Sequence, residues 1–208
     1  MSAESLSAGD IRAGYGGGDI IHGVSVLARP GEVASIVGPN GSGKSTLLKA
    51  LAGVIRPSGG TVRLGSRDIT GLPPEEVARA GVGYVPQVDD VFGPLTVREN
   101  LQMGGYLLAR SRVGERIDRV IAVFLLDEPT ANLAPKVAGE LLNEHVRALA
   151  ESGAAVLIVE QRARAALAIS RHTYVLGGGQ VLMHGTPAEL AADAAFTESF
   201  LGGRSVAG

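Results

Sequence analysis

The sequence predicts a single-domain α/β protein in which short buried strands alternate with helices. Apolar runs such as Glu32–Val37 and Ala155–Val159 have the length and composition of buried strands, and segments with helical spacing follow them. Thirty of the 208 residues are glycine, as expected of a chain with many tight turns. The length suits one folding unit over residues 1–208, with room for a small inserted subdomain.

The amino-acid composition argues against several classes of function. A formal net charge of −2 does not support a nucleic-acid binder or a protein that binds anionic membranes. The chain has no cysteine, which excludes disulfides, thiolate zinc sites and cysteine nucleophiles and is compatible with a reducing cytoplasm. No apolar stretch reaches about 18 residues, so we expect a soluble chain with no direct membrane insertion.

The first elements are predicted as two strands, Ser7–Ala13 and Asp19–Ala28, joined by a glycine-rich turn that carries Tyr15. The strand Glu32–Val37 follows. It enters a glycine-rich loop, and the helix Thr46–Leu51 leaves that loop. This arrangement of strand, loop and helix is the context in which the loop can bind a ligand through backbone N–H groups.

That loop fits the phosphate-binding pattern G-x-x-x-x-G-K-[ST] at every specified position. Its residues are Gly38, Pro39, Asn40, Gly41, Ser42, Gly43, Lys44, Ser45 and Thr46. The glycines let backbone N–H groups approach phosphate oxygens, Lys44 adds a positive charge, and the Ser45 hydroxyl is a ligand for Mg²⁺. The loop predicts a nucleotide site rather than a turn without chemistry. Tyr15, ahead of it, either stacks on adenine or is a half-buried packing residue.

Further strands and helices follow the loop. Arg56–Gly60 is predicted as a turn, Thr61–Leu64 as a strand and Pro73–Arg79 as a short helix. Gly83–Gln87 is another strand with a polar end. Gln87 is either simply solvated or in contact with magnesium or a water, because the carboxyl ends of strands in α/β proteins face the ligand.

An apolar strand that ends in two adjacent carboxylates supplies the second half of the chemistry. It spans Val120–Pro129 and carries Asp127 and Glu128. Beside a phosphate loop, the first acid is predicted to hold Mg²⁺, and the second to orient the attacking water and accept its proton. Without the phosphate loop, Asp127 and Glu128 would be interpreted as an ordinary polar turn that ends a strand.

A helical pattern runs into that strand without a turn. Its apolar positions, spaced i, i+3, i+4 and i+7, are Ile117, Val120, Ile121 and Phe124. They predict an amphipathic helix from about Gly114, although successive elements are normally joined by several loop residues. Either Val120–Leu126 is entirely strand and the helix is a stub, or a segment is missing between Val123 and Leu125. An earlier helical run, Leu95–Arg110, begins with a capping box formed by Thr96 and Glu99.

The remaining elements alternate regularly. They are predicted as a helix at Ala134–Glu151, a strand at Ala155–Val159, a helix at Gln161–Ser170, a hairpin over Tyr174–Met183 with a glycine turn, a helix at Thr186–Leu190 and a short helix ending near Phe200. The four histidines, His22, His145, His172 and His184, have no metal-ligand spacing, so we expect ordinary surface or packing residues.

Together these motifs resemble the ATP-binding cassette ATPases, and within them the LivF-type subunit of branched-chain amino acid importers. The residues that carry the resemblance are Tyr15, Asp19–Ser25, Gly38–Thr46, Tyr84–Gln87, Val91–Phe92, Leu95–Leu101, Leu125–Pro129, Asn132–Pro135, Ile158–Gln161 and Phe200–Gly202. They cover nearly the whole chain. The resemblance implies a P-loop core with an N-terminal antiparallel β subdomain and a truncated helical subdomain inserted at about 88–122.

The resemblance also implies roles for single residues. Tyr15 would stack on adenine, and Gln87 would sense Mg²⁺ and the membrane partner. Asp127 would be the magnesium ligand and Glu128 the general base. Gln161 occupies the position of the switch histidine of most cassettes, and an amide can bond a γ-phosphate but cannot relay a proton as imidazole does.

One motif of the family is absent. Cassettes carry a Leu-Ser-Gly-Gly-Gln-like signature a few dozen residues before the magnesium aspartate, and nothing similar occurs here. It should lie between Phe124 and Leu125, where the helical pattern meets the strand. In the family, two cassettes close head to tail over ATP, so a homodimer of this chain would lack the signature at both sites.

The resemblance therefore implies an ATP-hydrolysing importer subunit that binds ATP and Mg²⁺. Its partners would be a second cassette subunit, identical or different, and integral membrane permeases that hold it on the inner face of the membrane, in the cytoplasm. The alternative is a nucleotide-binding cassette that does not hydrolyse. A phosphate-loop kinase or GTPase is disfavoured, because no acceptor-site or guanine-reading pattern is evident.

Overall fold

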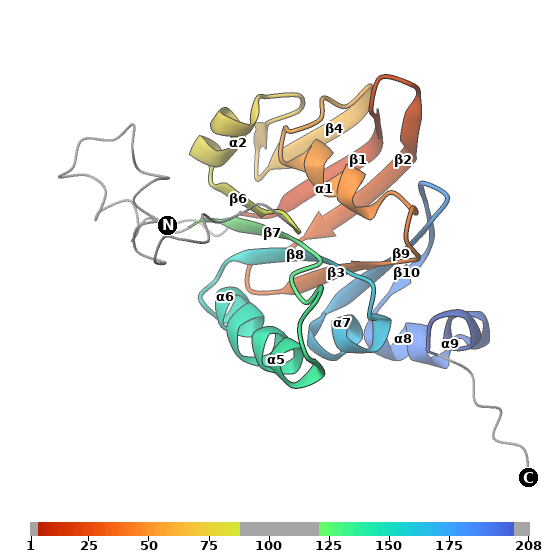
Figure 1. The fold of residues 1–208 in the computed structure, drawn as a ribbon. Coiled ribbons are helices and arrows are strands. Elements are labelled where there is room, and N and C mark those ends of the chain that lie inside the picture. Colours follow the sequence, from red (N-terminus) through yellow and green to blue (C-terminus); the bar gives the residue numbers. More distant parts are fainter. Residues whose placement is uncertain (1–3, 88–120, 202–208) are drawn as a thin grey trace, which may run out of the picture.

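Two sheets and the helices around them form the protein in the computed structural model, which describes residues 4–87 and 121–201 (Figure 1). One sheet has six strands and the other has four. The α/β fold class predicted from the sequence is confirmed, as is the antiparallel N-terminal sheet.

The six-stranded sheet forms the centre of the molecule. In spatial order its strands are β10 (Gln180–Gly185), β9 (His172–Gly177), β3 (Val33–Val37), β8 (Ala155–Glu160), β7 (Val123–Asp127) and β6 (Val82–Val85). Neighbouring strands are parallel except β10, which is antiparallel to β9. Every residue of β3 and β8 is buried, because layers cover both faces, and this explains their continuous apolar sequences.

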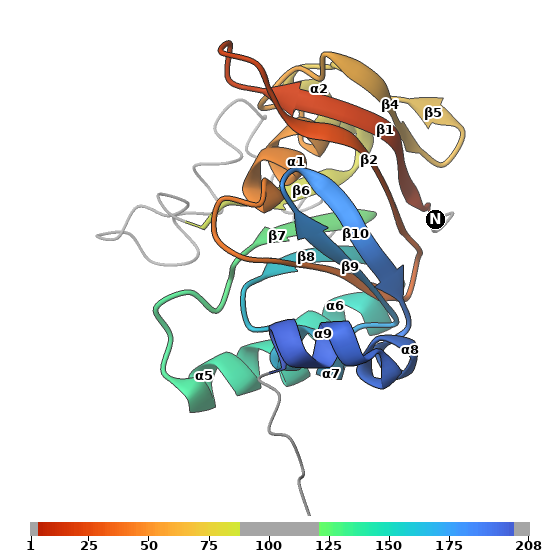
Figure 2. The same cartoon turned by 90° about the vertical axis from the view of Figure 1, so that its right-hand side faces the viewer.

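The four-stranded antiparallel sheet lies over one face of the central sheet (Figure 2). Its order is β2 (Asp19–Ala28), β1 (Leu6–Gly14), β4 (Gly59–Leu64) and β5 (Arg67–Asp68). The predicted pair of N-terminal strands is confirmed. The predicted turn Arg56–Gly60 is too long, because Gly59 already pairs with Arg12 of β1 and begins β4.

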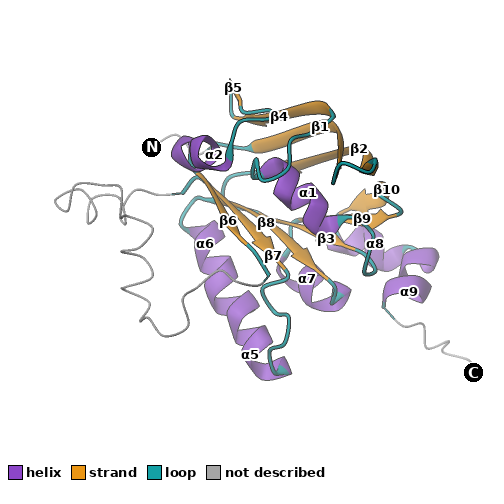
Figure 3. Cartoon of the chain, turned by 45° about the horizontal axis from the view of Figure 1, so that its top comes forward, coloured by secondary structure: helices purple, strands orange, loops and turns teal. Residues whose placement is uncertain are grey.

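The helices divide between the two faces of the central sheet (Figure 3). On the side of the antiparallel sheet lie α1 (Lys44–Leu51) and α2 (Pro74–Ala80). On the other side lie α5 (Pro135–Glu140), a π-helical turn (Leu141–Val146), α6 (Arg147–Glu151), α7 (Ala163–Ile169), α8 (Pro187–Ala192) and α9 (Ala194–Phe200). The helix predicted from Gln161 begins two residues later, at Ala163, so Gln161 belongs to the loop after β8.

Strand β7 corrects the helical interpretation of the residues before the two acids. Its pairing with β8 is unbroken from Val123, opposite Ala155, to Asp127, opposite Val159. Phe124 and Leu125 are therefore successive residues of one regular strand, and ladder hydrogen bonds to neighbours on both sides override the helical spacing at Phe124.

Several sequence predictions fall outside the described residues. They are the helical run Leu95–Arg110 with its cap at Thr96 and Glu99, the helix from about Gly114 as far as Val120, and all but the last two residues of the subdomain at 88–122. Over 4–87 and 121–201, no helix is long and apolar enough to cross a membrane.

Pairing of β9 with β10 brings together two histidines that are far apart in sequence. His172 Nε2 lies 3.2 Å from His184 Nδ1, and the His172 ring centroid is 4.8 Å from that of Tyr174. His172 and His184 thus pack against each other, which agrees with the expectation of surface or packing residues. Within the described parts of the chain, no group of three or more histidine or acidic residues is arranged to hold a metal ion.

Candidate nucleotide-binding site

The predicted site residues other than Tyr15 meet at the carboxyl edge of the central sheet. The glycine-rich loop follows β3, Asp127 ends β7, Glu160 ends β8, and Gln87 lies two residues beyond β6. Because these strands are parallel neighbours, their carboxyl ends open on one side. A cavity of about 540 Å³ lies there; its lining residues are Ile20, Asn40, Gly41, Gly43, Lys44, Ser45, Thr46, Gln87, Glu128, Thr130, Ala131, Asn132, Glu160, Gln161 and Arg162.

The loop from Gly38 to Gly43 has a conformation that requires glycine. A Cβ on Gly38 would lie 2.2 Å from the carbonyl oxygen of Leu176. Gly43 precedes the first turn of α1 with φ of 99°, and a Cβ there would lie 2.6 Å from Ile21 Cδ1. Only glycine fits both places without strain, so the backbone can curl tightly at the start of α1, where N–H groups can bind an anion.

Ser42 adds a polar group with an unmet hydrogen bond. Its side chain is 3% exposed, and its Oγ has no hydrogen-bond partner among the described residues. Buried hydroxyls almost always have a partner, so this one is an exception, and Ser42 is not among the lining residues of the cavity. The fit of the loop to a phosphate group rests instead on Gly38 and Gly43, where the close backbone leaves no room for a Cβ.

Lys44 is buried and placed between the loop and an acid. The side chain is 4% exposed, and its Nζ donates to the carbonyl oxygens of Gly38 at 3.0 Å and Pro39 at 3.1 Å. The same Nζ lies 3.4 Å from Oε1 of Glu128. Its charge is compensated on both sides, as a buried ammonium group requires.

Ser45 and Asp127 bring a hydroxyl and a carboxylate together. Ser45 Oγ donates to Asp127 Oδ1 at 2.9 Å, and the Tyr84 hydroxyl donates to Oδ2 at 3.3 Å. Burial raises the pKa of Tyr84, and the charge of Asp127 raises it further, so the phenol keeps its proton and remains a donor. Mg²⁺ prefers oxygen ligands, and the Ser45 hydroxyl and the Asp127 carboxylate place two oxygens side by side. These two residues therefore fit a magnesium ion.

Glu128 and Gln87 lie just beyond the ends of the neighbouring strands β7 and β6, and their side chains are in contact. Gln87 Nε2 donates to Glu128 Oε2 at 3.2 Å. The strand predicted to include Gln87 ends earlier, at Val85, which frees Gln87 to turn toward the acid. Glu128 itself has φ of 48°, in the left-handed region that side chains rarely adopt, and its N–H donates to Val159 O at 3.0 Å.

Of the two remaining predicted residues, Gln161 lines the cavity and Tyr15 does not. Gln161 lines it from the loop after β8. Tyr15 lies in the turn between β1 and β2, is 57% exposed and is not a lining residue of this cavity. Its hydroxyl accepts from Lys49 Nζ at 3.4 Å, and the same Nζ lies 5.7 Å from the ring centroid.

Sequence reasoning did not single out Tyr84, Thr130 or Glu160 as site residues. Glu160 is 2% exposed and accepts from the N–H and the hydroxyl of Thr130. One sequence feature could have identified Glu160 as a site residue: it is a charged residue directly after the apolar run Ala155–Val159, at the end of a strand predicted to be buried. Tyr84 carried no such signal, since a tyrosine inside a strand is ordinary.

A cavity lined by a phosphate loop, its lysine and Glu128, with Asp127 bonded to Ser45 of that loop, defines a P-loop nucleotide-binding protein. Residues 21–170 match the model of the family described as ABC transporter. The chain belongs to this family and is one of its ATPases, which bind and hydrolyse ATP.

Curated relatives match most of the chain. A probable branched-chain amino acid transport ATP-binding protein, LivF, of Archaeoglobus fulgidus is 33% identical over 92% of this chain and 96% of its own length. The high-affinity branched-chain amino acid transport ATP-binding protein BraG of Pseudomonas aeruginosa is 31% identical over 95% and 100%. The lipopolysaccharide export ATP-binding protein LptB of Acidithiobacillus ferridurans is 32% identical over 96% and 98%.

The fold also matches solved cassettes. The ADP conformation of an ATP-binding cassette of an ABC transporter superposes with a TM-score of 0.80 at 26% identity, covering 97% of this chain and 100% of that one. The alignment with the LivF relative spans 227 residues, more than the 208 of this chain. The relative therefore has residues without a counterpart here.

Proposed function

We propose that this chain is the ATP-binding, ATP-hydrolysing subunit of an ABC importer that carries branched-chain amino acids. The observation that carries the hydrolytic part is that Lys44, Ser45 and Glu128 line one cavity, with the buried Asp127 hydrogen-bonded to Ser45. The cargo follows from the two relatives that are named for branched-chain amino acid transport. The LptB relatives make lipopolysaccharide export the competing assignment.

The phosphate loop would bind the nucleotide and the strand ends would act on it. Backbone N–H groups of Gly38–Thr46 and the Lys44 ammonium bind the β- and γ-phosphates. Ser45, Asp127 and Gln87 hold Mg²⁺, which when bound neutralises charge on those phosphates. Glu128 orients the attacking water and accepts its proton.

Tyr15 and Gln161 complete the proposed site. Tyr15 is exposed on a glycine-rich turn, so its ring is available to stack on an adenine. Gln161 lines the cavity and donates its amide hydrogens to the γ-phosphate. Since an amide does not accept and release a proton as imidazole does, Glu128 is the general base.

The proposed partners are a second cassette subunit and integral membrane permeases, which hold the chain on the cytoplasmic face of the membrane. The helical subdomain inserted at about 88–122, truncated here, would belong to the same single domain. Since the chain lacks the signature motif, we further propose that its competent partner is a different cassette that carries one. That partner's signature would complete the phosphate loop of this chain.

The alternative proposal is a cassette that binds nucleotide without hydrolysing it. It is supported by the missing signature and by relatives whose aligned length exceeds this chain. Binding alone needs only the loop Gly38–Thr46, so ATP binding without turnover would distinguish this alternative from the first proposal.

The experiment that tests the cargo is leucine uptake. Cells lacking the chain are supplied with the wild-type chain or with Glu128→Gln, and uptake of radiolabelled leucine is measured. Uptake restored by the wild type and not by Glu128→Gln supports the proposal. Normal leucine uptake without the chain contradicts import of branched-chain amino acids, and defective lipopolysaccharide export in the same cells would favour the competing assignment.

A further inference from the structure

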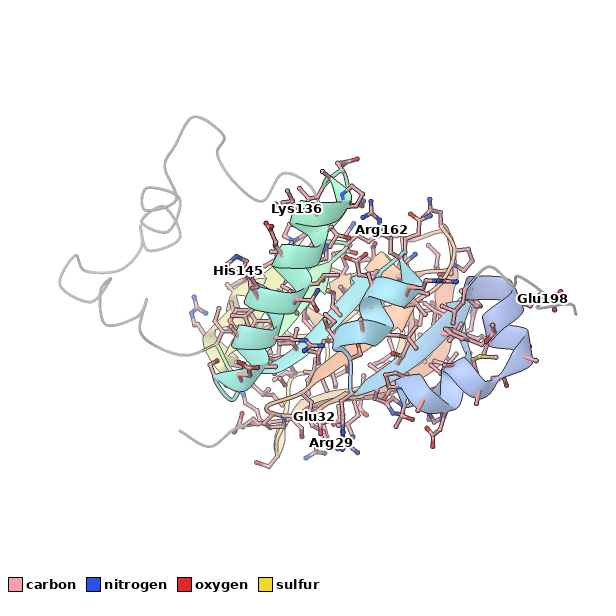
Figure 4. All side chains as sticks on the ribbon, turned by 90° about the horizontal axis from the view of Figure 1, so that it is seen from below. Arg29, Glu32, Lys136, His145, Arg162 and Glu198 are labelled. Atoms are coloured by element: carbon pink, nitrogen blue, oxygen red, sulfur yellow. The ribbon has the colours of Figure 1, made fainter. Side chains whose placement is uncertain are left out.

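A buried carboxylate that the proposed mechanism does not use lies in the wall of the cavity. Glu160, the last residue of β8, is 2% exposed and lines the same cavity as Glu128. Figure 4 shows Arg162, two residues further on, at the end of the sheet where Lys136 lies in the first turn of α5, far from Arg29 and Glu32 at the other end. Glutamate is almost never buried to this degree unless it is paired.

The partner of Glu160 is Thr130, in the turn that follows the neighbouring strand β7. Oε1 of Glu160 accepts from the Thr130 hydroxyl at 2.8 Å and from the Thr130 N–H at 3.2 Å. Thr130 is itself 2% exposed. Both hydrogen bonds lie away from water, where losing one of them would leave a buried polar group without a partner. They tie the turn after β7 to the end of β8.

That turn carries Glu128 and has a backbone that needs outside support. Glu128 has φ of 48° and Asn132 has φ of 63°, both in the left-handed region. Such conformations persist in residues other than glycine only where surrounding contacts determine them. The turn is attached to β8 at two points, by Glu128 N–H to Val159 O at 3.0 Å and by Thr130 to Glu160.

Charge at Glu160 is not what the turn requires. Burial raises the pKa of Glu160, the charge of Glu128 raises it further, and the two bonds from Thr130 and the charge of Arg162 oppose the rise. The ionised form of Glu160 is therefore less favoured at this position than it would be in water. A glutamine has the same length and an oxygen that can accept both hydrogen bonds without a charge.

We propose that Glu160 is a positioning residue that fixes the catalytic Glu128 by holding Thr130 through one carboxylate oxygen. Its role in turnover rests on the proposed function, but its effect on the position of Glu128 does not. Gln87 Nε2 donates to Glu128 Oε2 at 3.2 Å, so the side-chain amide of Gln87 reports where Glu128 lies.

The test records the Gln87 side-chain amide by NMR on protein labelled with ¹⁵N-glutamine, with Gln87→Ala to assign the signal. The variants are Glu160→Ala and Glu160→Gln. Glu128→Ala serves as the reference for a displaced or absent partner, and Glu198→Ala, an exposed acid on α9, as the matched control. Affinity for a fluorescent ATP analogue and single-turnover hydrolysis are measured on the same proteins.

Glu160→Ala is expected to shift the Gln87 signal toward that of Glu128→Ala and to reduce turnover on the order of 10- to 100-fold, because small displacements of a reacting group are costly. Affinity for the ATP analogue stays within about threefold, since the phosphate loop is untouched. Glu160→Gln returns the signal and the turnover toward wild type. Glu198→Ala leaves both unchanged.

Two outcomes overturn the inference. One is a Gln87 signal that Glu160→Ala leaves in place. The other is a Glu160→Ala variant that loses affinity, turnover and melting temperature together, with no rescue by glutamine, which would indicate a general structural role. If the wild type binds no nucleotide, the proposed function fails, but the NMR comparison still decides on Glu160.

Discussion

The ammonium of Lys44 lies 3.4 Å from the carboxylate of Glu128, which joins the phosphate loop after β3 to the strand end of β7. Lys44 is 4% exposed and Glu128 14%. The proposed binder of phosphate and the proposed base are thus paired with each other. An incoming γ-phosphate, which carries negative charge, would compete with Glu128 for the same ammonium group.

This pairing makes a prediction for Glu128→Gln. The amide no longer competes for Lys44 and no longer repels the γ-phosphate, so ATP affinity is expected to stay equal or increase. Hydrolysis is expected to fall at least about 100-fold, because general-base catalysis is lost. Equilibrium binding and single-turnover hydrolysis check both halves. Weaker ATP binding by the variant would contradict the competition between carboxylate and phosphate.

A second prediction concerns Gly38. Gly38→Ala places a Cβ 2.2 Å from the carbonyl oxygen of Leu176, so β3 and β9 must move apart at this point. Overpacking of this kind costs about 1–3 kcal/mol. Urea unfolding measures the loss, and Gly139→Ala is the matched control, because a Cβ there meets nothing within 4 Å. Equal stabilities for the two variants would be inconsistent with the close approach.

The Tyr84 hydroxyl gives a third prediction. Tyr84→Phe removes the hydrogen bond to Asp127 at 3.3 Å and leaves the ring in place. The expected loss in the free energy of unfolding is about 0.5–1.5 kcal/mol, the net value of such a bond. Asp127 keeps its bond from Ser45, so ATP binding should persist. A variant as stable as wild type in urea would show that this bond adds nothing.

The fourth prediction is a dependence of stability on pH through His172. Burial lowers the pKa of His172 below its usual 6.5, and the charges of His184 and Arg29 lower it further, against Glu189 and Glu32. The folded protein therefore binds fewer protons at His172 than the unfolded chain does. This contribution to stability is present above pH 6.5 and is lost as the pH falls through that value toward the folded pKa.

The check is urea unfolding of wild type and His172→Asn at several pH values between about 7.5 and 5.5. The wild type should lose more stability than the variant over this range. His145→Asn, on the exposed side of the π-helical turn, is the control. An identical pH dependence for wild type and His172→Asn would contradict the lowered pKa.

The sequence predicted most of the fold because its strands lie in a fully covered sheet. Short continuous apolar runs, such as those of β3 and β8, are typical of strands buried on both faces, and the loop pattern indicated where α1 begins. Phe124 fitted both a helical spacing and the strand before Asp127, and its pairing with β6 and β8 decides for the strand. Pairing between distant segments is not visible in local periodicity.

The candidate site was predictable where a residue belongs to a pattern. The loop, Asp127 and Glu128 do, and their proximity follows from the order of parallel strands. Thr130 and Glu160 do not, because their connection depends on how the turn after β7 bends toward β8. The pair His172 and His184 was missed for the same reason, since it forms across the β9–β10 hairpin.

The most direct test of the proposed nucleotide site is equilibrium binding of ATP to the wild type and to Lys44→Met. Methionine has a similar length and no charge, so it removes the ammonium while keeping much of the packing. We expect saturable binding to the wild type and a loss of affinity of at least about tenfold in the variant, equivalent to about 1.4 kcal/mol. Equal binding by two folded proteins would show that ATP does not bind at this loop.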